Sequence, residues 1–415
     1  MNTCILDEIN FLVPDKYVEK IKKRLGADFI IKPLNDVGPL KSAKTLDLLI
    51  DDPRYTGRFM AKNLDFIRDD AQFSLLATAL DQAGTLDQSF NSLVQRNESD
   101  YRVFNLSEGM PFLREKLNYK VVICGLGDVG GTLLTGLRLL GDETILEIMI
   151  YDRNETKAQR WYREASQVLR PDGSYMPPIR IITKAELFSG DVFVFCVSAG
   201  VPPLGRESAE DVRMVQLTQN AAILKEYVDL ADAADYKGSF FIVSDPVDQL
   251  CMYAFRHGHL RSQQIRGFGL GVMYARAMFN ADLKHLPTAE LRVYGPHGRG
   301  LQVLNSVSQY DEAMAAELTE LTTTENIKIR EVGFKPYIAP AMSSGALSIL
   351  ACLKGQWNYS STLLDGVWFG AKNRQKGLYV EYEALPLSAG FLAKLAGTKQ
   401  ALADSMNIFD TEVAP

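Results

Sequence analysis

Histidine is scarce in this chain: its 415 residues include four, and none of them has the HExxH spacing of a zinc protease. Cysteine occurs five times without any CxxC pair, which argues against both a zinc ribbon and a disulfide framework. We therefore expect no metal site. The cysteines are interpreted as core thiols: Cys4, Cys124, Cys196, Cys251 and Cys352.

An excess of basic residues is also missing. The formal net charge is -6 and the isoelectric point is near 5.5, which argues against a general nucleic-acid partner. Long apolar runs are absent, and the first twenty residues carry acids without a long apolar core, so we expect neither a secretory signal nor a membrane span. A cytoplasmic protein is the resulting expectation. A GK[ST] phosphate loop and a GxSxG nucleophile elbow are lacking as well, which disfavours nucleoside triphosphate and serine hydrolase chemistry.

What the sequence does contain is a strand that runs directly into a glycine turn. Residues 120–131 read KVVICGLGDVGG, with glycines at Gly125, Gly127 and Gly130. Such glycines permit a tight turn, close approach of the backbone to a pyrophosphate, and close packing of helix on strand. A helix beginning at Asp128 and Val129 would direct its N-terminal N–H groups toward the phosphates. The pattern predicts a dinucleotide site.

A second strand, residues 145–152, ends in an acid at the spacing that ribose recognition requires. Asp152 lies 22 positions beyond Gly130, close to the ~20 typical of such sites. Its carboxylate would accept hydrogen bonds from the ribose hydroxyls and repel a 2'-phosphate, which favours NAD over NADP, although the adjacent Arg153 leaves NADP open. An aspartate that merely ends a strand is the alternative interpretation.

Further apolar strands alternate with helical patterns along the chain, at residues 179–182, 191–199, 239–245 and 265–269. This alternation predicts an α/β fold with a Rossmann-type, doubly wound parallel sheet. The first 117 residues lack the rhythm and contain helical patterns at 15–25 and 64–83. They are predicted to form a mostly helical N-terminal extension of unknown role.

Six motifs in a fixed order resemble landmarks of the L-lactate/malate dehydrogenase family. They cover much of residues 118–300, and a weaker match continues toward the C-terminus. The resemblance implies an NAD-binding Rossmann domain at 118–269, a mixed α/β substrate-binding and catalytic domain at 270–415, and assembly as a homodimer or homotetramer. The motifs are GLGDVGG (125–131), SAGVPPLG (198–205), TQNAAILKEY (218–227), SDPVD (244–248), MYAR (273–276) and YGPHGRG (294–300).

Two residues in these motifs would carry the family's chemistry. His297 is the candidate proton donor and acceptor, because imidazole has the side-chain pKa closest to physiological pH. Arg276 is the candidate clamp for a substrate carboxylate, since guanidinium makes two parallel charge-assisted bonds. The alternatives are a structural histidine and a solvated arginine. Arg276 lies within the apolar stretch VMYARAMF, where an unpaired cation is costly.

The sequence departs from the family at the partner of this histidine. Met273 stands where the family has the aspartate that orients its catalytic histidine. Asp245 stands where the family has asparagine, and we hypothesise that it substitutes as the carboxylate partner or contacts the substrate. Pro203 stands where malate enzymes present an arginine to the second carboxylate, which disfavours a simple oxaloacetate site.

The loop after residue 199 is longer than the usual family loop. Arg213 aligns with the mobile-loop arginine that polarises the substrate carbonyl; a solvated loop charge is the alternative interpretation. Ser343 or Ser344 is a candidate to line the substrate pocket. The remaining cofactor-binding residues implied by the resemblance are Ser198, Ala199, Gly200 and Asn220.

Together these features favour an NAD-dependent oxidoreductase whose small-molecule carboxylate substrate is a 2-hydroxy or 2-oxo acid, with bulky or unusual side chains left open. The alternative is a dinucleotide-binding regulatory or structural protein that has lost dehydrogenase activity, which Met273 and the altered loop would support. A third interpretation, an NAD-dependent glycosidase, lacks the expected cysteine and histidine metal motifs.

Overall fold

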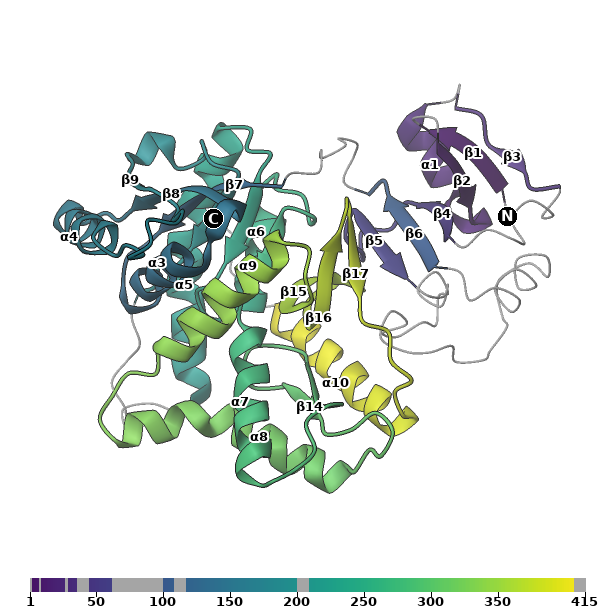
Figure 1. The fold of residues 1–415 in the computed structure, drawn as a ribbon. Helices are drawn as coiled ribbons and strands as arrows, with labels where there is room; N and C mark the ends of the chain where they lie inside the picture. Colours follow the sequence, from purple (N-terminus) through teal and green to yellow (C-terminus); the bar gives the residue numbers. More distant parts are fainter. Residues whose placement is uncertain are drawn as a thin grey trace.

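The computed structural model describes residues 2–6, 9–26, 29–35, 45–61, 100–107, 117–199 and 209–406. Its central feature is a run of six parallel strands in the order β12-β11-β10-β7-β8-β9 (Figure 1). The strands are β7 (Tyr119–Cys124), β8 (Ile145–Tyr151), β9 (Ile179–Ile181), β10 (Val192–Phe195), β11 (Ser239–Ile242) and β12 (Ile265–Gly267). Because the strand order reverses between β7 and β10, this sheet has the doubly wound topology expected from the sequence.

Helices on both faces explain why these strands are apolar throughout. Along β7, Val121 packs in the core cluster that contains Leu133 and Leu137 of α3, while its neighbour Val122 packs in the cluster that contains Leu224 of α5. Successive side chains of a strand alternate between faces, so burial on both sides requires a continuous apolar run. The covering helices are α3 (Asp128–Leu140), α4 (Glu155–Ser166), α5 (Ala209–Ala233) and α6 (Val247–His257), with 3-10 turns at η4 (Asp142–Thr144) and η5 (Lys184–Glu186).

The observed strands are shorter at their carboxyl ends than predicted. The strand expected at 191–199 ends at Phe195, which pairs with Cys124, the last residue of β7. After Cys124 the chain that forms β7 enters the glycine turn. Strand β10 therefore has no further residues of β7 to pair with. The chain therefore leaves the sheet at this edge, where ligands bind in open α/β sheets.

The C-terminal part continues the same sheet in the antiparallel sense. Strand β15 pairs antiparallel with β12, and β16 and β17 follow. A separate hairpin, β13-β14, and the helices complete this mixed α/β region (Figure 1). The elements are α7 (Leu270–Leu283), β13 (Arg292–Tyr294), β14 (Gln302–Leu304), α8 (Glu312–Glu331), the π-helix η6 (Pro340–Leu347), α9 (Ser348–Leu353), β15 (Asn358–Leu364), β16 (Val367–Lys376), β17 (Tyr379–Tyr382) and α10 (Ala389–Met406).

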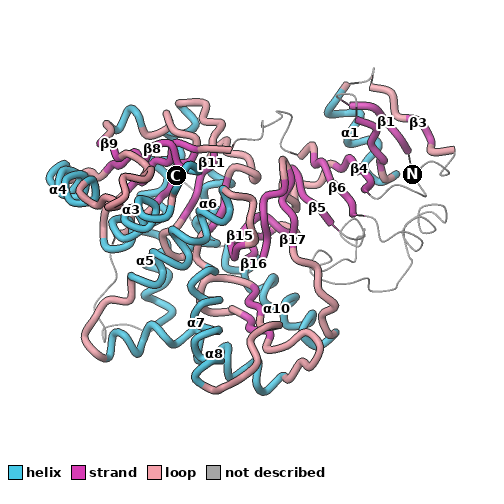
Figure 2. The backbone as a smooth tube through the Cα atoms, in the orientation of Figure 1, coloured by secondary structure: helices cyan, strands magenta, loops and turns pink. Residues whose placement is uncertain are grey.

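The N-terminal region is not confirmed as helical, which corrects the expectation of a mostly helical extension. Its described residues are mostly strands (Figure 2), with a helical segment where 15–25 was predicted; the predicted helix at 64–83 lies outside the described residues. Short strands such as TLDLLI are easily missed because their stabilising partners lie elsewhere in the chain. The elements are β1 (Asn2–Leu6), β2 (Ile9–Val13), η1 (Asp15–Tyr17), α1 (Val18–Leu25), β3 (Lys32–Pro33), β4 (Thr45–Ile50), β5 (Arg58–Ala61) and β6 (Asp100–Asn105).

These N-terminal strands share a sheet and a core with the C-terminal part. Strand β5 pairs parallel with β17, with Phe59 opposite Val380. Phe59 and Phe104 also belong to the same buried cluster as Phe369 and Phe391 of the C-terminal part. The described part of the N-terminal region therefore packs as an integral layer of the fold. None of the described helices is long and apolar enough to cross a membrane.

Candidate functional site

The glycine turn after β7 brings the start of α3 against the sheet. Gly125 has a φ of +93°, which L side chains rarely adopt, and a Cβ atom there would lie 2.9 Å from Val197 Cγ2. A Cβ on Gly130 would lie 1.8 Å from the carbonyl oxygen of Gly125. Larger residues at these two positions would force the helix away from the strand, so both glycines are required by the local packing.

Gly127 differs from its two neighbours because it faces open space. A Cβ atom placed on it would have no heavy atom within 4 Å, and its φ is −71°, so neither strain nor packing requires glycine there. It is the N-cap of α3, without a side-chain cap, and Asp128 and Val129 form the first turn. An uncapped helix N-terminus beside open space fits a phosphate group that approaches the backbone closely.

Asp152 follows β8 and holds the glycine turn from the other side. Its Oδ2 accepts a hydrogen bond from the backbone N–H of Leu126 at 2.8 Å, its Oδ1 accepts one from Asn154 at 2.9 Å, and Lys157 Nζ lies 3.5 Å from Oδ2. A carboxylate has about four lone-pair sites. Asp152 can therefore brace the turn and still accept a bond from a ribose hydroxyl.

Arg153, which left the choice between NAD and NADP open, has a partner on α5. Its Nη2 lies 2.6 Å from Glu226 Oε2, and Lys184 Nζ lies 2.5 Å from Oε1 of the same carboxylate. Glu226 thus pairs with two cations, so the three groups together keep one positive charge. The pairing holds the Arg153 guanidinium against α5, and the choice between NAD and NADP rests on Asp152.

Asn220 of α5 ties together the loops that follow β10 and β11. Its side chain is fully buried, its Oδ1 accepts a hydrogen bond from the N–H of Ala199 at 2.8 Å, and its Nδ2 donates to the carbonyl of Asp245 at 2.6 Å. Ser198 and Ala199 are exposed at the edge of the sheet. Asn220 therefore fixes the backbone of Asp245.

Three other residues singled out in the sequence lie wholly or partly outside the described part of the chain. Gly200 lies outside the described residues, as does Pro203. Arg213 falls within α5, but its side chain lies outside the part that the structure describes. Their predicted roles stay predictions.

His297 lies beside Asp245, in the loop between β13 and β14. Its Nδ1 is 2.7 Å from Asp245 Oδ1, although 52 residues separate the two in sequence. The histidine side chain is 13% exposed and that of Asp245 is 49% exposed, so the pair lies at the protein surface with the ring largely covered. The carboxylate that Met273 cannot supply is therefore present, on a different element.

The close fit around His297 depends on a glycine that the sequence motifs did not single out. A Cβ atom on Gly269, the N-cap of α7, would lie 2.6 Å from the Cβ atom of His297. The backbone N–H of His297 also donates a hydrogen bond to Asp248 Oδ2 at 3.1 Å. Asp248 is the second acid of the SDPVD motif. Its place in that motif was the sequence signal that could have identified it as a residue of the site.

Arg276 and Met273 lie on α7, one turn apart. Met273 is buried, and its Sδ lies 3.7 Å from Arg276 Nη1. Burial lowers the pKa of Arg276, while Asp245 and Glu325 act to raise it. Within the described part of the chain Arg276 makes no ion pair with a carboxylate. A partly buried guanidinium without such a partner is suited to bind an anion.

Ser344, a candidate to line the substrate pocket, is instead used by the fold. Its hydroxyl is buried, donates to the carbonyl of Gly269 at 2.7 Å and accepts from the N–H of Val272 at 2.8 Å. It thus fixes the start of α7, on which Arg276 is carried. This position is structural because the first turn of a helix leaves N–H groups without intrahelical partners.

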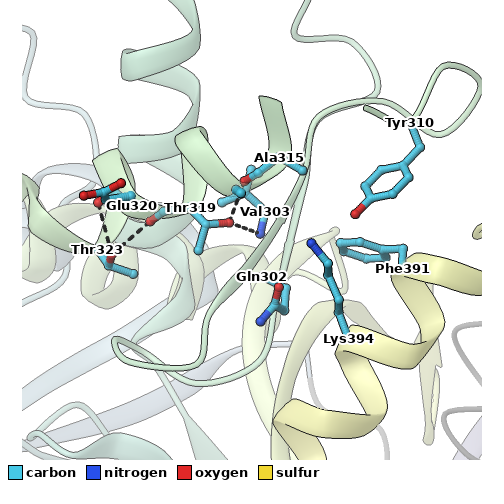
Figure 3. Close-up of a pocket in the computed structure, with 10 residues that line it drawn as sticks. Gln302, Val303, Tyr310, Ala315, Thr319, Glu320, Thr323, Phe391 and Lys394 are labelled. Carbon is cyan, nitrogen blue, oxygen red and sulfur yellow. Dashed lines mark hydrogen bonds between the residues drawn. The ribbon is translucent and has the colours of Figure 1, made fainter. Parts of the chain in front are cut away.

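A separate pocket lies between β14, α8 and α10 (Figure 3). Its volume is about 350 Å³, and none of its lining residues is among the predicted site residues. Tyr310 and Phe391 pack with ring centroids 5.4 Å apart beside Lys394, which is paired with Glu312. Its lining residues are Gln302, Val303, Tyr310, Ala315, Ala316, Thr319, Glu320, Thr323, Phe391 and Lys394.

The sequence comparison finds L-lactate dehydrogenases. L-lactate dehydrogenase 2 of Lactiplantibacillus plantarum is 27% identical over 217 residues, which cover 51% of this chain and 65% of the relative. The L-lactate dehydrogenase of Latilactobacillus sakei is 25% identical over 189 residues, 44% of this chain and 54% of the relative. The chain thus spans between half and two-thirds of the length of these relatives. No family model matches it.

Solved structures of the same kind share the fold. The minor L-lactate dehydrogenase of Enterococcus mundtii superposes with a TM-score of 0.61 at 17% identity, covering 72% of this chain and all of the other. The malate dehydrogenase of Picrophilus torridus gives a TM-score of 0.56 at 17% identity, covering 70% and 97%. The sequence matches and the shared fold support a divergent member of the L-lactate/malate dehydrogenase family.

Proposed function

We propose that the protein is an NAD-dependent oxidoreductase that transfers a hydride between the nicotinamide and a 2-hydroxy or 2-oxo acid. The observation that carries this proposal is the contact between His297 Nδ1 and Asp245 Oδ1 at 2.7 Å. It rebuilds a carboxylate–imidazole pair in a chain whose sequence lost the family's aspartate at Met273. Dinucleotide binding alone does not require such a pair at the carboxyl edge of the sheet.

The pairing assigns the proton chemistry to one atom of the ring. An ionised carboxylate only accepts hydrogen bonds, so Nδ1 of His297 carries a hydrogen when it bonds to Asp245. The atom left to exchange a proton is Nε2. We infer that Nε2 takes the hydroxyl proton when the substrate is oxidised and returns it when the 2-oxo acid is reduced. Asp245 stabilises the imidazolium formed in the oxidation.

Arg276 supplies the positive charge for the substrate carboxylate. It is partly buried and has no carboxylate partner among the described residues, so a substrate anion would complete its ion pair. A guanidinium fork also fixes the orientation of a carboxylate, which aligns the carbon that gives or receives the hydride. In the proposal Arg213 closes over the substrate.

The cofactor would lie along the glycine turn, where the residues present fit a dinucleotide. The N–H groups at the start of α3 would hold the pyrophosphate beside Gly127, and Asp152 would accept from the ribose. Bound NAD supplies the hydride acceptor for the reaction. The carboxylate of Asp152 favours NAD over NADP, because it would repel a 2'-phosphate.

The variant Gly127→Ala should weaken NADH binding about tenfold or more with only a small loss of thermal stability, because alanine is a poorer N-cap residue than glycine. The added methyl group would occupy the open space that the pyrophosphate requires, while it meets no protein atom within 4 Å. Fluorescence titration with NADH and thermal unfolding measure the two properties. Gly397→Ala, a glycine of α10 that likewise has no atom of the described residues within 4 Å, is the matched control; it should leave NADH affinity unchanged and raise thermal stability slightly, because alanine is the better helix former. An unchanged NADH affinity in Gly127→Ala would place the cofactor elsewhere.

The proposed function is tested by oxidation of NADH by the purified protein against a panel of 2-oxo acids, from pyruvate and oxaloacetate to branched and aromatic ones. We expect turnover with at least one acid and weak activity on oxaloacetate, because Pro203 stands where malate enzymes have an arginine. NADH binding without turnover of any acid would instead support a regulatory role. Mass in solution, measured alongside, tests the proposed homodimer or homotetramer.

A further inference from the structure

Asp248 is a buried carboxylate that no step of the proposed chemistry uses. It lies in the first turn of α6 and is 3% exposed. Its Oδ2 accepts the hydrogen bond from the backbone N–H of His297 at 3.1 Å, and its Oδ1 accepts a hydrogen bond from Ser361 Oγ of β15. One carboxylate thus connects α6, β15 and the loop that carries His297.

Burial makes this arrangement costly. Burial raises the pKa of Asp248 to about 6, against the opposing effects of the hydrogen bonds from Ser361 and His297. Asp245 faces the same group and raises its pKa further. A buried carboxylate is retained at such a position only where hydrogen bonds satisfy it, and a neutral side chain would avoid the desolvation cost. The presence of Asp248 therefore indicates a role that needs a hydrogen-bond acceptor at this position.

Asp245 and Asp248 hold different parts of His297. Asp245 contacts the imidazole ring, and Asp248 contacts the backbone. Both aspartates belong to one short stretch that runs from the end of β11 into the first turn of α6, and Asn220 fixes the start of that stretch through the carbonyl of Asp245. On the opposite side, Gly269 allows α7 to press against the Cβ atom of His297. The ring is thereby located by contacts to its backbone, its Cβ atom and its Nδ1.

We propose that Asp248 is a positioning residue that sets the place of the His297 backbone, so that the imidazole meets both Asp245 and the substrate. This inference rests on the proposed function. Displacement of a catalytic group by about 1 Å can cost roughly 10²-fold in rate. Loss of the Asp248 acceptor should therefore lower kcat while NADH affinity stays unchanged, because the glycine turn is not involved.

The test compares three substitutions at two positions. Asp248→Ala removes the acceptor and should lower kcat about 10²-fold, with NADH affinity within a factor of two of the unsubstituted protein. Asp248→Asn keeps an acceptor oxygen of the same shape and should recover most of the lost kcat. Ser361→Ala removes one bond to Asp248 and should lower kcat several-fold. Its matched control is Ser360→Ala: Ser360 is the neighbouring residue of β15, and its hydroxyl contacts Asn373 of β16 instead of Asp248.

A spectroscopic signal makes the test independent of turnover. The proton of the His297 Nδ1–Asp245 hydrogen bond should give a low-field NMR resonance, identified by its absence in Asp245→Asn. We expect the resonance to be lost in Asp248→Ala and retained in Asp248→Asn and Ser360→Ala. If Asp248→Ala fails to fold, Ser361→Ala provides the test instead. A lower kcat together with a shifted resonance in Ser361→Ala would support the positioning role of Asp248.

The outcomes separate the two proposals. If the unsubstituted protein reduces no 2-oxo acid, the proposed function fails, while loss of the resonance in Asp248→Ala still supports positioning. If the unsubstituted protein is active and Asp248→Ala, or Ser361→Ala in its place, keeps both full kcat and the resonance, the positioning role is overturned. A parallel loss of NADH affinity and kcat would also overturn it, because it would indicate general disruption.

Discussion

Replacement of His297 by asparagine should lower kcat by about 10²- to 10⁴-fold, the usual contribution of a positioned general acid or base. Asparagine keeps a polar group near the loop but cannot give up or take a proton at neutral pH. NADH affinity should be unchanged, because the glycine turn and Asp152 do not contact the His297 side chain. Steady-state kinetics with the best 2-oxo acid and a fluorescence titration with NADH measure the two effects separately.

The matched control is His259→Asn. His259 is 94% exposed and pairs with Asp232, away from the carboxyl edge of the sheet, so its replacement should leave kcat within about twofold. Full activity in His297→Asn would remove His297 from the mechanism and leave the proton to another group. Loss of both kcat and NADH affinity would instead indicate that the loop between β13 and β14 shapes the cofactor site.

Replacement of Asp245 by asparagine should lower kcat by about 10²-fold or more and change the pH profile. The amide can still bond to Nδ1 of His297, but it cannot stabilise the imidazolium, and it permits the wrong tautomer of the ring. The substitution is close to isosteric, so the bond from Asn220 to the backbone carbonyl of residue 245 should persist. The measurement is kcat and kcat/KM over pH 5 to 9, with thermal unfolding to check the fold. An unchanged rate and pH profile would show that Asp245 is not the partner.

A second substitution tests whether the carboxylate has moved from α7 to the loop after β11. Met273→Asp in the Asp245→Asn background restores the arrangement that the family resemblance implies, and it places the new carboxylate beside Arg276, whose Nη1 lies 3.7 Å from the Met273 sulfur. We expect a partial recovery of kcat relative to Asp245→Asn. Met273→Asn in the same background is the control, since it adds a polar group of similar size without the charge and should recover nothing.

The sequence was most informative where a structural feature depends on neighbouring residues. The glycine turn, the helix that starts at Asp128 and the strand ending before Asp152 were predicted because each requires specific residue types within a few positions. The parallel sheet followed from the repetition of strand and helix. The carboxyl ends of the strands were less well predicted, since a strand ends where its partner ends.

The N-terminal region shows the opposite case. Its strands are short, and β5 is completed by β17, more than 300 positions later in the chain. The apolar pattern of RFMA does not contain that information. A strand whose stabilisation comes from distant partners and a shared core is harder to recognise from its own residues than the glycine turn.

The features of the candidate site also fall into those predictable from the sequence and those that depend on contacts between distant elements. The groups available to the site could be read from the sequence: one candidate proton carrier in His297, a guanidinium in an apolar helix, and an aspartate at 245 in a motif where the family has asparagine. The tertiary structure was needed to show that Asp245 lies 2.7 Å from His297 Nδ1, that Asp248 accepts from the His297 backbone, and that Gly269 leaves room for the His297 side chain. These contacts join residues from different elements, so they arise from the packing of α6, α7 and the β13-β14 loop against one edge of the sheet.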